Sequence, residues 1–209
     1  MYFKYGEKEI SYLKAKDKKL AEVIEKVGLI KRAVEPDLFY AVVHSIAGQQ
    51  ISNKALETVW QRLQNACRQI TPEAIVKADI QALRSCGLSA RKVEYIKDFA
   101  TQIINGALDL EALQKLPDKE VIEVLSGLKG IGVWTAEMIL LFCLQRQDVL
   151  SYGDLGIQRG LRMVYHHRKI TKVLFEKYRK RYSPYGSVAS FYLWAVAGGA
   201  IPEMKDFIL

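Results

Sequence analysis

Two features of this sequence combine residue types and spacings that are suited to chemistry. Residues 128–136 read Leu-Lys-Gly-Ile-Gly-Val-Trp-Thr-Ala, in which Gly130 and Gly132 can form a tight turn that leads into a helix. Amide groups in the first turn of a helix lack intrahelical partners and can bind a phosphate group. Asp154 follows 22 positions after Gly132 (132 to 154), where its carboxylate can act on whatever the turn presents. In this order, the two features indicate an enzyme that acts on DNA.

Each feature also has a simpler structural explanation. Two glycines can merely end one helix and begin the next, and the aspartate of Gly-Asp-Leu-Gly is a good N-cap residue. The fuller pattern Leu-x-Gly-x-Gly-x-x-Thr-Ala lies between predicted helices over 118–126 and 133–145, which favours a phosphate-binding hairpin. The donors that this hairpin would offer are the N–H groups of Gly132, Val133 and Trp134 and the hydroxyl group of Thr135.

Composition narrows the class of protein and the kind of partner. The chain has 209 residues, 50% of them hydrophobic, which is enough for one large domain or two lobes. Its 31 Lys and Arg residues against 23 Asp and Glu residues give a formal net charge of +8, which favours a polyanionic partner.

No Cys-x-x-Cys occurs among Cys67, Cys86 and Cys143, so we expect neither a zinc site nor an iron–sulfur cluster. No apolar run resembles a signal peptide or a membrane span, so we expect a cytoplasmic protein with reduced thiols.

Helical periodicity dominates the chain, and no segment shows the alternation that is typical of a strand. Asp37 can cap a helix whose apolar positions continue to Leu63, past a polar interruption at Gln49-Gln50. The pattern therefore predicts an all-α fold with short connections. Other helices are predicted over residues 20–27, 90–104, 118–126, 133–145, 154–165, 171–181 and 187–198.

The segment 118–160 resembles the helix-hairpin-helix superfamily of DNA base-excision glycosylases, and within its alkylpurine branch the DNA-3-methyladenine glycosylase II family. Residues 45–52 (Ser-Ile-Ala-Gly-Gln-Gln-Ile-Ser) are similar to that family's early Gln-Gln segment, and residues 86–92 (Cys-Gly-Leu-Ser-Ala-Arg-Lys) to its Gly-hydrophobic-Ser-x-Arg-Lys turn. Residues 183–194, from Ser-Pro-Tyr-Gly to Tyr-Leu-Trp, resemble its closing motif. Each likeness is weak alone, but the set follows the family's order over about residues 20–198.

The resemblance implies a two-lobed helical bundle with a helix-hairpin-helix motif and a cleft between the lobes that binds DNA and the base. Residues 1–36 and 146–209 would form the lobe that carries Asp154. Residues 37–145 would form a central lobe that ends in the helix-hairpin-helix motif at 118–145.

The resemblance also implies a reaction. The family's catalytic group is an aspartate downstream of the hairpin, and Asp154 stands at the matching position. Breaking an N-glycosidic bond develops positive charge on the deoxyribose, which a carboxylate can stabilise while it orients the attacking water. In strand-cleaving relatives such as endonuclease III, a lysine nucleophile occupies the position of Trp134. An indole cannot form a Schiff base, so we expect a monofunctional enzyme that leaves an abasic site.

Such an enzyme must flip the damaged base out of the duplex into a pocket. Aromatic faces would attract the positive charge of an N-alkylated purine, although each candidate can instead be a core or wall residue. The candidates for this base pocket are Trp134, Trp194, Tyr152 and Tyr185.

Flipping leaves a gap in the duplex that a side chain must fill. By resemblance, Gln50 occupies the position of the intercalating residue, with Gln49 beside it at the minor groove; a helix cap or a hydrogen-bonded core position is the alternative. Arg91 and Lys92 can contact the DNA backbone or only solvent. The family's hairpin also binds a monovalent cation (Na⁺ or K⁺), and no other cofactor is expected. The cation's ligands would be the backbone carbonyls of Ser126, Leu128 and Gly130.

We therefore expect a monomeric base excision repair enzyme that removes alkylated purines of the 3-methyladenine type from duplex DNA. The alternatives are a glycosylase for deaminated, oxidised or mispaired bases and a non-catalytic helix-hairpin-helix DNA-binding protein. Gly186 stands where many relatives carry a large residue, so it can enlarge the cleft. The basic residues between Arg159 and Lys169 are expected to form a solvated face.

Overall fold

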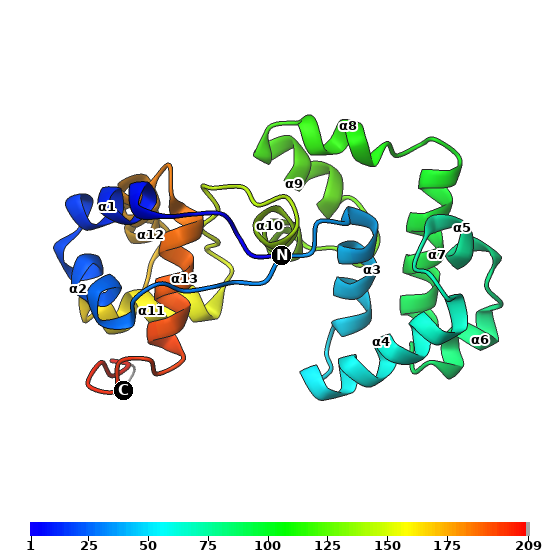
Figure 1. Cartoon of the computed structure of the whole chain (residues 1–209), viewed down its shortest axis with the longest axis horizontal. Coiled ribbons are helices and arrows are strands. Elements are labelled where there is room, and N and C mark those ends of the chain that lie inside the picture. The colour runs from blue at the N-terminus through cyan, green and yellow to red at the C-terminus, as the bar shows by residue number, and fades with distance from the viewer. Residues whose placement is uncertain (208–209) are drawn as a thin grey trace. The chain divides into compact units, whose positions relative to one another are not determined.

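The structure is a computed structural model that describes residues 1–207, and its chain folds into two compact units of helices (Figure 1). Unit 1 contains residues 1–34 and the chain from Gln145 onward, and unit 2 contains residues 35–144. Within residues 1–207 no strand forms, and the single antiparallel bridge joins Tyr2 to Ala33. The predicted all-α fold is therefore confirmed.

Unit 1 is built around one buried helix. Helix α13 buries nine of its twelve residues, as expected for a helix that is apolar on all sides. Helix α11 packs closely on it because Gly160 has no side chain: a Cβ atom there would lie 2.3 Å from the carbonyl oxygen of Leu193. The helices of unit 1 are α1 (Glu7–Lys16), α2 (Lys18–Val27), α11 (Leu155–Tyr165), α12 (Lys172–Tyr182) and α13 (Gly186–Ala197).

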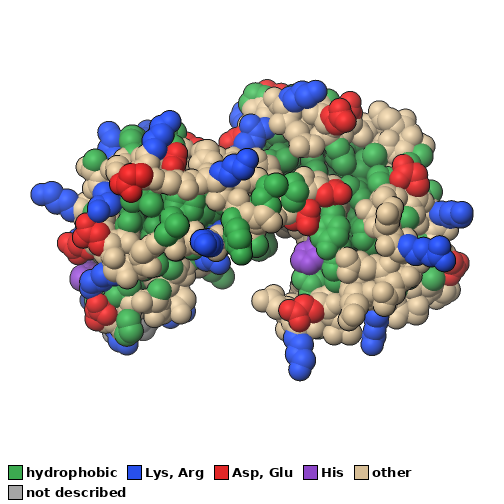
Figure 2. All heavy atoms as spheres, in the orientation of Figure 1, with side chains coloured by type: hydrophobic (Ala, Val, Ile, Leu, Met, Phe, Trp, Pro, Cys, Tyr) green, Lys and Arg blue, Asp and Glu red, His purple; other side chains and the backbone are tan. Residues whose placement is uncertain are grey.

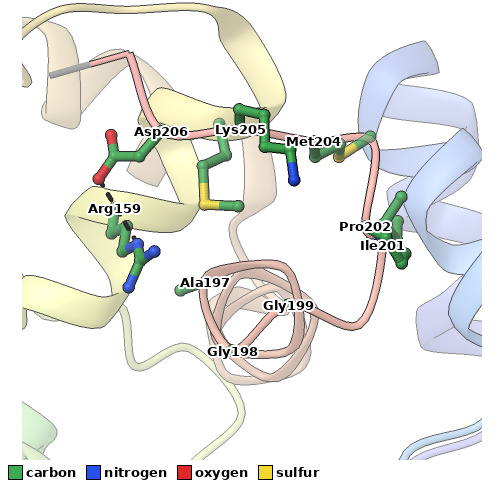
Figure 3. A pocket seen from close by; sticks show the side chains of 10 residues that line it. Arg159, Ala197, Gly198, Gly199, Ile201, Pro202, Met204, Lys205 and Asp206 are labelled. Carbon is green, nitrogen blue, oxygen red and sulfur yellow. Dashed lines mark ion pairs between the residues drawn. The ribbon is translucent and has the colours of Figure 1, made fainter. Parts of the chain in front are cut away.

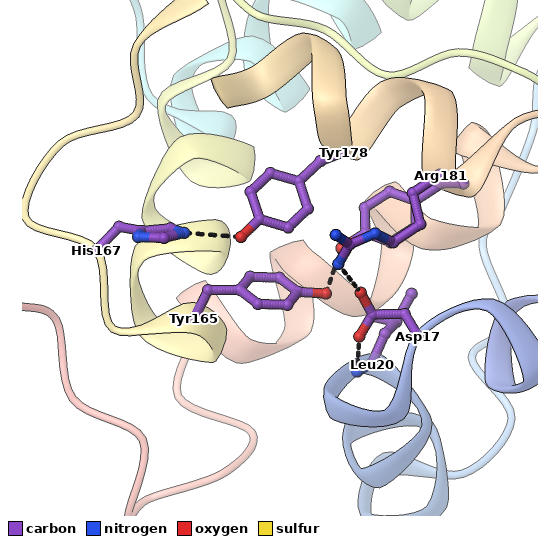
Figure 4. A network of polar contacts seen from close by, with 7 residues as sticks. Asp17, Leu20, Tyr165, His167, Tyr178 and Arg181 are labelled. Atoms are coloured by element: carbon purple, nitrogen blue, oxygen red, sulfur yellow. Dashed lines mark hydrogen bonds and ion pairs between the residues drawn. The ribbon is translucent and has the colours of Figure 1, made fainter. Parts of the chain in front are cut away.

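A buried polar network joins three helices of unit 1 (Figure 4). The carboxylate of Asp17 caps α2 by accepting a hydrogen bond from the N–H of Leu20 at 2.9 Å, and it pairs with the guanidinium group of Arg181 from α12 at 2.5 Å. The hydroxyl groups of Tyr165 and Tyr182 lie 2.5 Å apart and connect α11 to α12. Desolvation on burial raises the pKa of both phenols. The network therefore satisfies buried polar groups and fixes the mutual position of these helices.

Unit 2 consists of eight helices, most of which start at a side-chain cap. The N-cap residues Ser52, Asp79 and Ser89, for example, each accept a hydrogen bond from an amide of the first turn. The rings of Phe39 and Phe99 stack in its core with centroids 5.3 Å apart. The helices of unit 2 are α3 (Leu38–Gly48), α4 (Asn53–Cys67), α5 (Pro72–Lys77), α6 (Ile80–Ser85), α7 (Ala90–Ile104), α8 (Leu110–Lys115), α9 (Asp118–Ser126) and α10 (Val133–Phe142).

The predicted helices at 90–104 and 118–126 have the observed bounds. Those at 20–27, 154–165, 171–181 and 187–198 differ from α2, α11, α12 and α13 by one or two residues at their ends, and two predictions differ more. The helix expected over 133–145 ends at Phe142. The Gln-Gln interruption is a full break between α3 and α4, because Gln50 adopts a left-handed backbone with φ of 58°.

Two further features concern the length of the helices and the distribution of charge on the surface. None of the helices described for residues 1–207 is long and apolar enough to cross a membrane. Lys and Arg side chains are spread over the visible face of each unit and alternate with Asp and Glu (Figure 2). On this face, the positive net charge is therefore dispersed rather than collected into one patch.

Candidate active site

The glycine hairpin (residues 127–132) connects α9 to α10 in unit 2. Leu128 and Ile131 are buried and anchor it, and the N–H of Ile131 donates a hydrogen bond to the carbonyl oxygen of Leu128 at 3.1 Å. Gly130 has φ of 82°, and a Cβ atom there would lie 2.3 Å from the ring of Tyr95. Glycine at position 130 is thus required both by the backbone conformation and by the close approach of an aromatic ring.

The start of α10 has the features expected of an anion site. Gly132 is its N-cap, provides no side-chain acceptor for the amides of the first turn, and has open space where a Cβ atom would be. Val133 and Trp134 follow with 56% and 49% of their surface exposed, which is unusual for two large apolar residues side by side. The hairpin can therefore approach a phosphate closely, with Trp134 projecting beside it.

A cavity of about 630 Å³ opens beside the hairpin, inside unit 2. Desolvation lowers the pKa of His44, one of its lining residues, and the imidazole ring packs edge-on against Trp60. The cavity is lined by His44, Ser45, Gly48, Gln49, Gln50, Leu56, Gly130, Gly132, Trp134, Thr135 and Met138.

The predicted DNA-contacting residues Gln49 and Gln50 lie in the break between α3 and α4. The amide nitrogen Nε2 of Gln49 donates a hydrogen bond to the carbonyl oxygen of Gly130 at 2.6 Å, so this side chain is tied to the hairpin. Gln50 is exposed. The structure thus brings the Gln-Gln segment and the hairpin together, although they are separated by 81 positions in the sequence.

Arg91 and Lys92, in the first turn of α7, have different surroundings. Arg91 is exposed, whereas the ammonium group of Lys92 donates hydrogen bonds to the carbonyl oxygens of Ala47 and Gln49 at 2.9 and 2.7 Å. Both residues line a second cavity, of about 490 Å³, which shares Gln49, Gln50 and Gly130 with the first.

Asp154 lies in unit 1 as the N-cap of α11 and is 93% buried, with 7% of its surface exposed. Its Oδ1 atom accepts hydrogen bonds from the N–H of Ile157 and from the indole N–H of Trp194, each at 2.8 Å. The capping explanation is therefore correct. It does not exclude a catalytic role, because the same two bonds hold the carboxylate in one orientation.

Gly156 makes room for this arrangement. A Cβ atom at position 156 would lie 2.8 Å from Cδ1 of Trp194 and 3.1 Å from Oδ1 of Asp154. Nothing in the sequence identified Gly156 as a site residue, since a glycine in the first turn of a helix has no meaning until its long-range neighbour is known.

The two tyrosines proposed for the base pocket, Tyr152 and Tyr185, both lie in unit 1. Tyr152 is 36% exposed and packs edge-on against Phe175 with ring centroids 5.2 Å apart. Tyr185 is half-buried, and its ring packs edge-on against Tyr12. Tyr152, two positions before Asp154, is thus accessible to solvent, whereas Tyr185 packs on α1.

Gly186 and Asp148 contact each other at the start of α13. Asp148 accepts hydrogen bonds from the hydroxyl group of Ser183 and the N–H of Gly186, so it caps this helix. A Cβ atom at 186 would lie 2.9 Å from Oδ1 of Asp148. Glycine at this position permits the close packing of α13.

The basic residues at the end of α11 have acidic and structural partners. Arg162 donates two hydrogen bonds, each of 2.8 Å, to the carboxylate of Asp206, which also pairs with Arg159 at 3.5 Å. Figure 3 shows Arg159 and Asp206 on the wall of a cavity where the chain leaves α13. Internal pairing explains these two arginines without DNA.

Two of the three carbonyls proposed as cation ligands already take part in hydrogen bonds. Those of Leu128 and Gly130 accept bonds from Ile131 and Gln49, and each oxygen keeps a second lone pair. In the part of the chain that the structure describes, no group of three or more His, Cys, Asp and Glu side chains could hold a metal ion.

Comparison with known proteins identifies relatives over most of the chain. Residues 43–184 match the HhH-GPD superfamily of base excision DNA repair proteins. The chain is 37% identical over 158 residues to DNA-3-methyladenine glycosylase 1 of Schizosaccharomyces pombe, covering 73% of this chain and 69% of that protein.

Two solved structures have the same fold. A DNA-3-methyladenine glycosidase from Bacillus halodurans has a TM-score of 0.88 at 36% identity, and the match covers 99% of this chain and 97% of the Bacillus halodurans chain. The Schizosaccharomyces pombe 3-methyladenine DNA glycosylase in complex with abasic DNA has a TM-score of 0.79 at 30% identity, with coverages of 92% and 97%.

Proposed function

Because the chain belongs to the HhH-GPD superfamily of base excision DNA repair proteins, we propose that it is a monofunctional DNA glycosylase for alkylated purines of the 3-methyladenine type. The relatives that carry the proposal are 3-methyladenine glycosylases, one of them solved with abasic DNA, the product of such a reaction. Its substrate is duplex DNA with a damaged base. The enzyme acts as a monomer in the compartment that contains the DNA.

The observation that carries the catalytic assignment is the fixed, buried carboxylate of Asp154. As the bond between C1′ and the purine nitrogen breaks, its electron pair leaves with the base and positive charge develops on the sugar. The carboxylate stabilises that charge, and it orients the water whose oxygen then bonds to C1′. The water's proton passes to the carboxylate or to solvent. A base that is already cationic leaves as a neutral molecule, so no strong general acid is required.

The hairpin and the tryptophans supply binding. The amides of Gly132 and Val133, with the hydroxyl group of Thr135, hold a backbone phosphate, and Gln50 fills the space that the flipped nucleotide leaves. Trp134 and Trp194 each offer an aromatic face to the cationic base. Since position 134 holds an indole rather than an amine, the reaction ends at the abasic site without strand cleavage.

A monovalent cation at the carbonyls of Ser126, Leu128 and Gly130 would supply positive charge near the phosphate. We expect DNA affinity to fall when K⁺ and Na⁺ are replaced by choline at constant ionic strength. Equal affinity in the two salts would remove the cation from the proposal while leaving the glycosylase assignment intact.

The decisive experiment is incubation with methylated duplex DNA, followed by identification of the released bases. The wild type should release 3-methyladenine, and strand breaks should appear only after alkali. Asp154→Asn keeps a good N-cap residue, so it should fold normally yet release base at least about a hundredfold more slowly.

The matched control for this experiment is Asp148→Asn, which alters another helix-capping aspartate of unit 1 and should retain activity. Full activity of Asp154→Asn would contradict the catalytic assignment. Salt-dependent duplex binding by a wild type that releases no base would indicate a non-catalytic DNA-binding protein. If only deaminated or oxidised bases are released, the substrates of the enzyme are those bases and not alkylated purines.

A further inference from the structure

The segment between α3 and α4, residues 49–52, is the wedge loop, because it carries Gln50, the proposed intercalating residue. Gln50 has φ of 58°, a conformation that is unfavourable for a residue with a side chain. Such a conformation persists only when surrounding contacts enforce it. Two contacts hold the residues that directly precede Gln50, one with α7 and one with the glycine hairpin.

The first contact is made by Lys92 of α7. Its ammonium group donates hydrogen bonds to the carbonyl oxygens of Ala47 and Gln49, at 2.9 and 2.7 Å. Carbonyl groups at the end of a helix lack intrahelical partners and carry the negative end of the helix dipole, so a lysine satisfies both needs. Desolvation lowers the pKa of Lys92, which agrees with an ammonium group drawn toward the protein.

The second contact is made by the wedge loop itself. The side-chain amide of Gln49 donates a hydrogen bond to the carbonyl oxygen of Gly130 in the hairpin, at 2.6 Å. Gln49 is therefore held through its own carbonyl by Lys92 and through its side chain by the hairpin. Gln50, the next residue, is exposed and lines both of the cavities described above.

We propose that Lys92 is a positioning residue, which holds the wedge loop in the conformation that inserts Gln50 into DNA. This inference rests on the proposed function and changes the role expected for Lys92 from a direct contact with the DNA backbone. Its ammonium group acts on two carbonyls of the protein, and its effect reaches DNA through the loop.

The chain offers a matched control on the same helix. Lys97 of α7 donates hydrogen bonds to the carbonyl oxygens of Ile75 and Val76 at the end of α5, at 3.1 and 2.8 Å. The chemistry of the contact is the same, but its target is not the wedge loop. Lys97→Met therefore reports what the loss of such a cap does to the fold alone.

The experiment compares single-turnover base release by Lys92→Met and Lys97→Met on two duplexes. In one the alkylated base is paired, and in the other it lies in a bulge, where it is already extrahelical. Because only the paired base must be unstacked, Lys92→Met should be at least about tenfold slower on the paired duplex and within about threefold of wild type on the bulge. Lys97→Met should match wild type on both.

Salt dependence separates positioning from direct phosphate contact. A lysine that binds a phosphate contributes about one unit to the slope of log affinity against log salt, and its replacement removes that unit. The slope should be unchanged in Lys92→Met. A slope reduced by about one unit, wild-type rates on the paired duplex, or equal losses on both duplexes would each overturn the proposal.

Two further variants keep the test decisive if Lys92→Met is poorly folded. Lys92→Arg retains a cationic donor and should recover most of the paired-duplex rate, whereas Gln49→Met, which loses the bond to the hairpin, should reproduce the selective loss. 2-Aminopurine placed beside the lesion reports duplex distortion without catalysis. If wild type releases no base, the proposed function fails, and a fluorescence change that Lys92→Met lacks but Lys97→Met retains still supports the positioning role.

Discussion

The indole N–H of Trp194 donates a hydrogen bond to Oδ1 of Asp154 at 2.8 Å, so a residue of α13 orients the carboxylate that caps α11. The bond gives Trp194 a role besides offering an aromatic face to a base. Trp194→Phe separates the two roles, because phenylalanine keeps a ring and loses the donor. A hydrogen bond to a charged acceptor contributes about 1.5–3 kcal/mol, so we expect base release to slow by about tenfold or more.

Single-turnover rates at saturating enzyme would measure this effect of Trp194→Phe, with DNA affinity measured in parallel. Affinity should change little, since the lost bond acts on the carboxylate. A variant with the wild-type rate would show that the bond from Trp194 is not needed to orient Asp154.

Gly156→Ala should impair the site without unfolding the protein. Alanine is normally favoured over glycine in a helix by about 1 kcal/mol, but here its Cβ atom would lie 2.8 Å from Trp194 and 3.1 Å from Asp154. The indole must move, and the orientation of the carboxylate changes with it. We expect a melting temperature near that of wild type and a clearly lower rate of base release. Gly6→Ala, at a position with open space, is the control; equal rates for the two variants would contradict this prediction.

Arg181→Met should destabilise unit 1 more than Arg179→Met, although both arginines lie on α12. Arg181 pairs with Asp17, whose side chain is 3% exposed, whereas Arg179 pairs with Glu176, whose side chain is 39% exposed. Removing the side chain of Arg181 leaves the buried carboxylate of Asp17 without its cation, and water can solvate that carboxylate only in part. The expected loss in the free energy of unfolding is about 2 kcal/mol for Arg181→Met and about 0–0.5 kcal/mol for Arg179→Met. Urea denaturation would measure both, and equal losses would refute the structural role of the network.

The thiol of Cys143 should be almost inert in the folded protein. Burial, with the negative charges of Glu35 and Asp37, raises its pKa from 9.0 to about 12. At a given pH, the raised pKa leaves far less of the thiolate, which is the reactive form. Mass spectrometry after maleimide labelling should find Cys143 modified only after denaturation, and the half-buried Cys67 first.

The same shift predicts a pH dependence of stability. A raised folded pKa favours the neutral thiol, so its contribution is complete below pH 9 and is lost as pH rises toward 12. The free energy of unfolding of wild type should therefore fall more steeply over this range than that of Cys143→Ala. Parallel slopes would show that the thiol ionises equally in both states.

The sequence by itself determined most of the longer helices, several of their caps and the hairpin, because these depend on hydrogen bonds and apolar spacings within a few residues; the helices α1, α6 and α8 and the break between α3 and α4 were not predicted. Ser89 and Asp154 could be recognised as caps from their neighbours, and Gly130 and Gly132 as a turn. Motif order along the chain then indicated the family.

Only the tertiary structure decided which distant groups meet. Trp194 and Asp154 are 40 positions apart, and Lys92 and the carbonyl of Gln49 are 43 apart. Their pairing follows from how α13 packs on α11 and how α7 lies beside the end of α3, which depend on the shapes of whole helix faces. Short-range patterns carry no information about such contacts, so the orienting roles of Trp194 and Gly156 and the contacts of Lys92 became visible only in the folded chain.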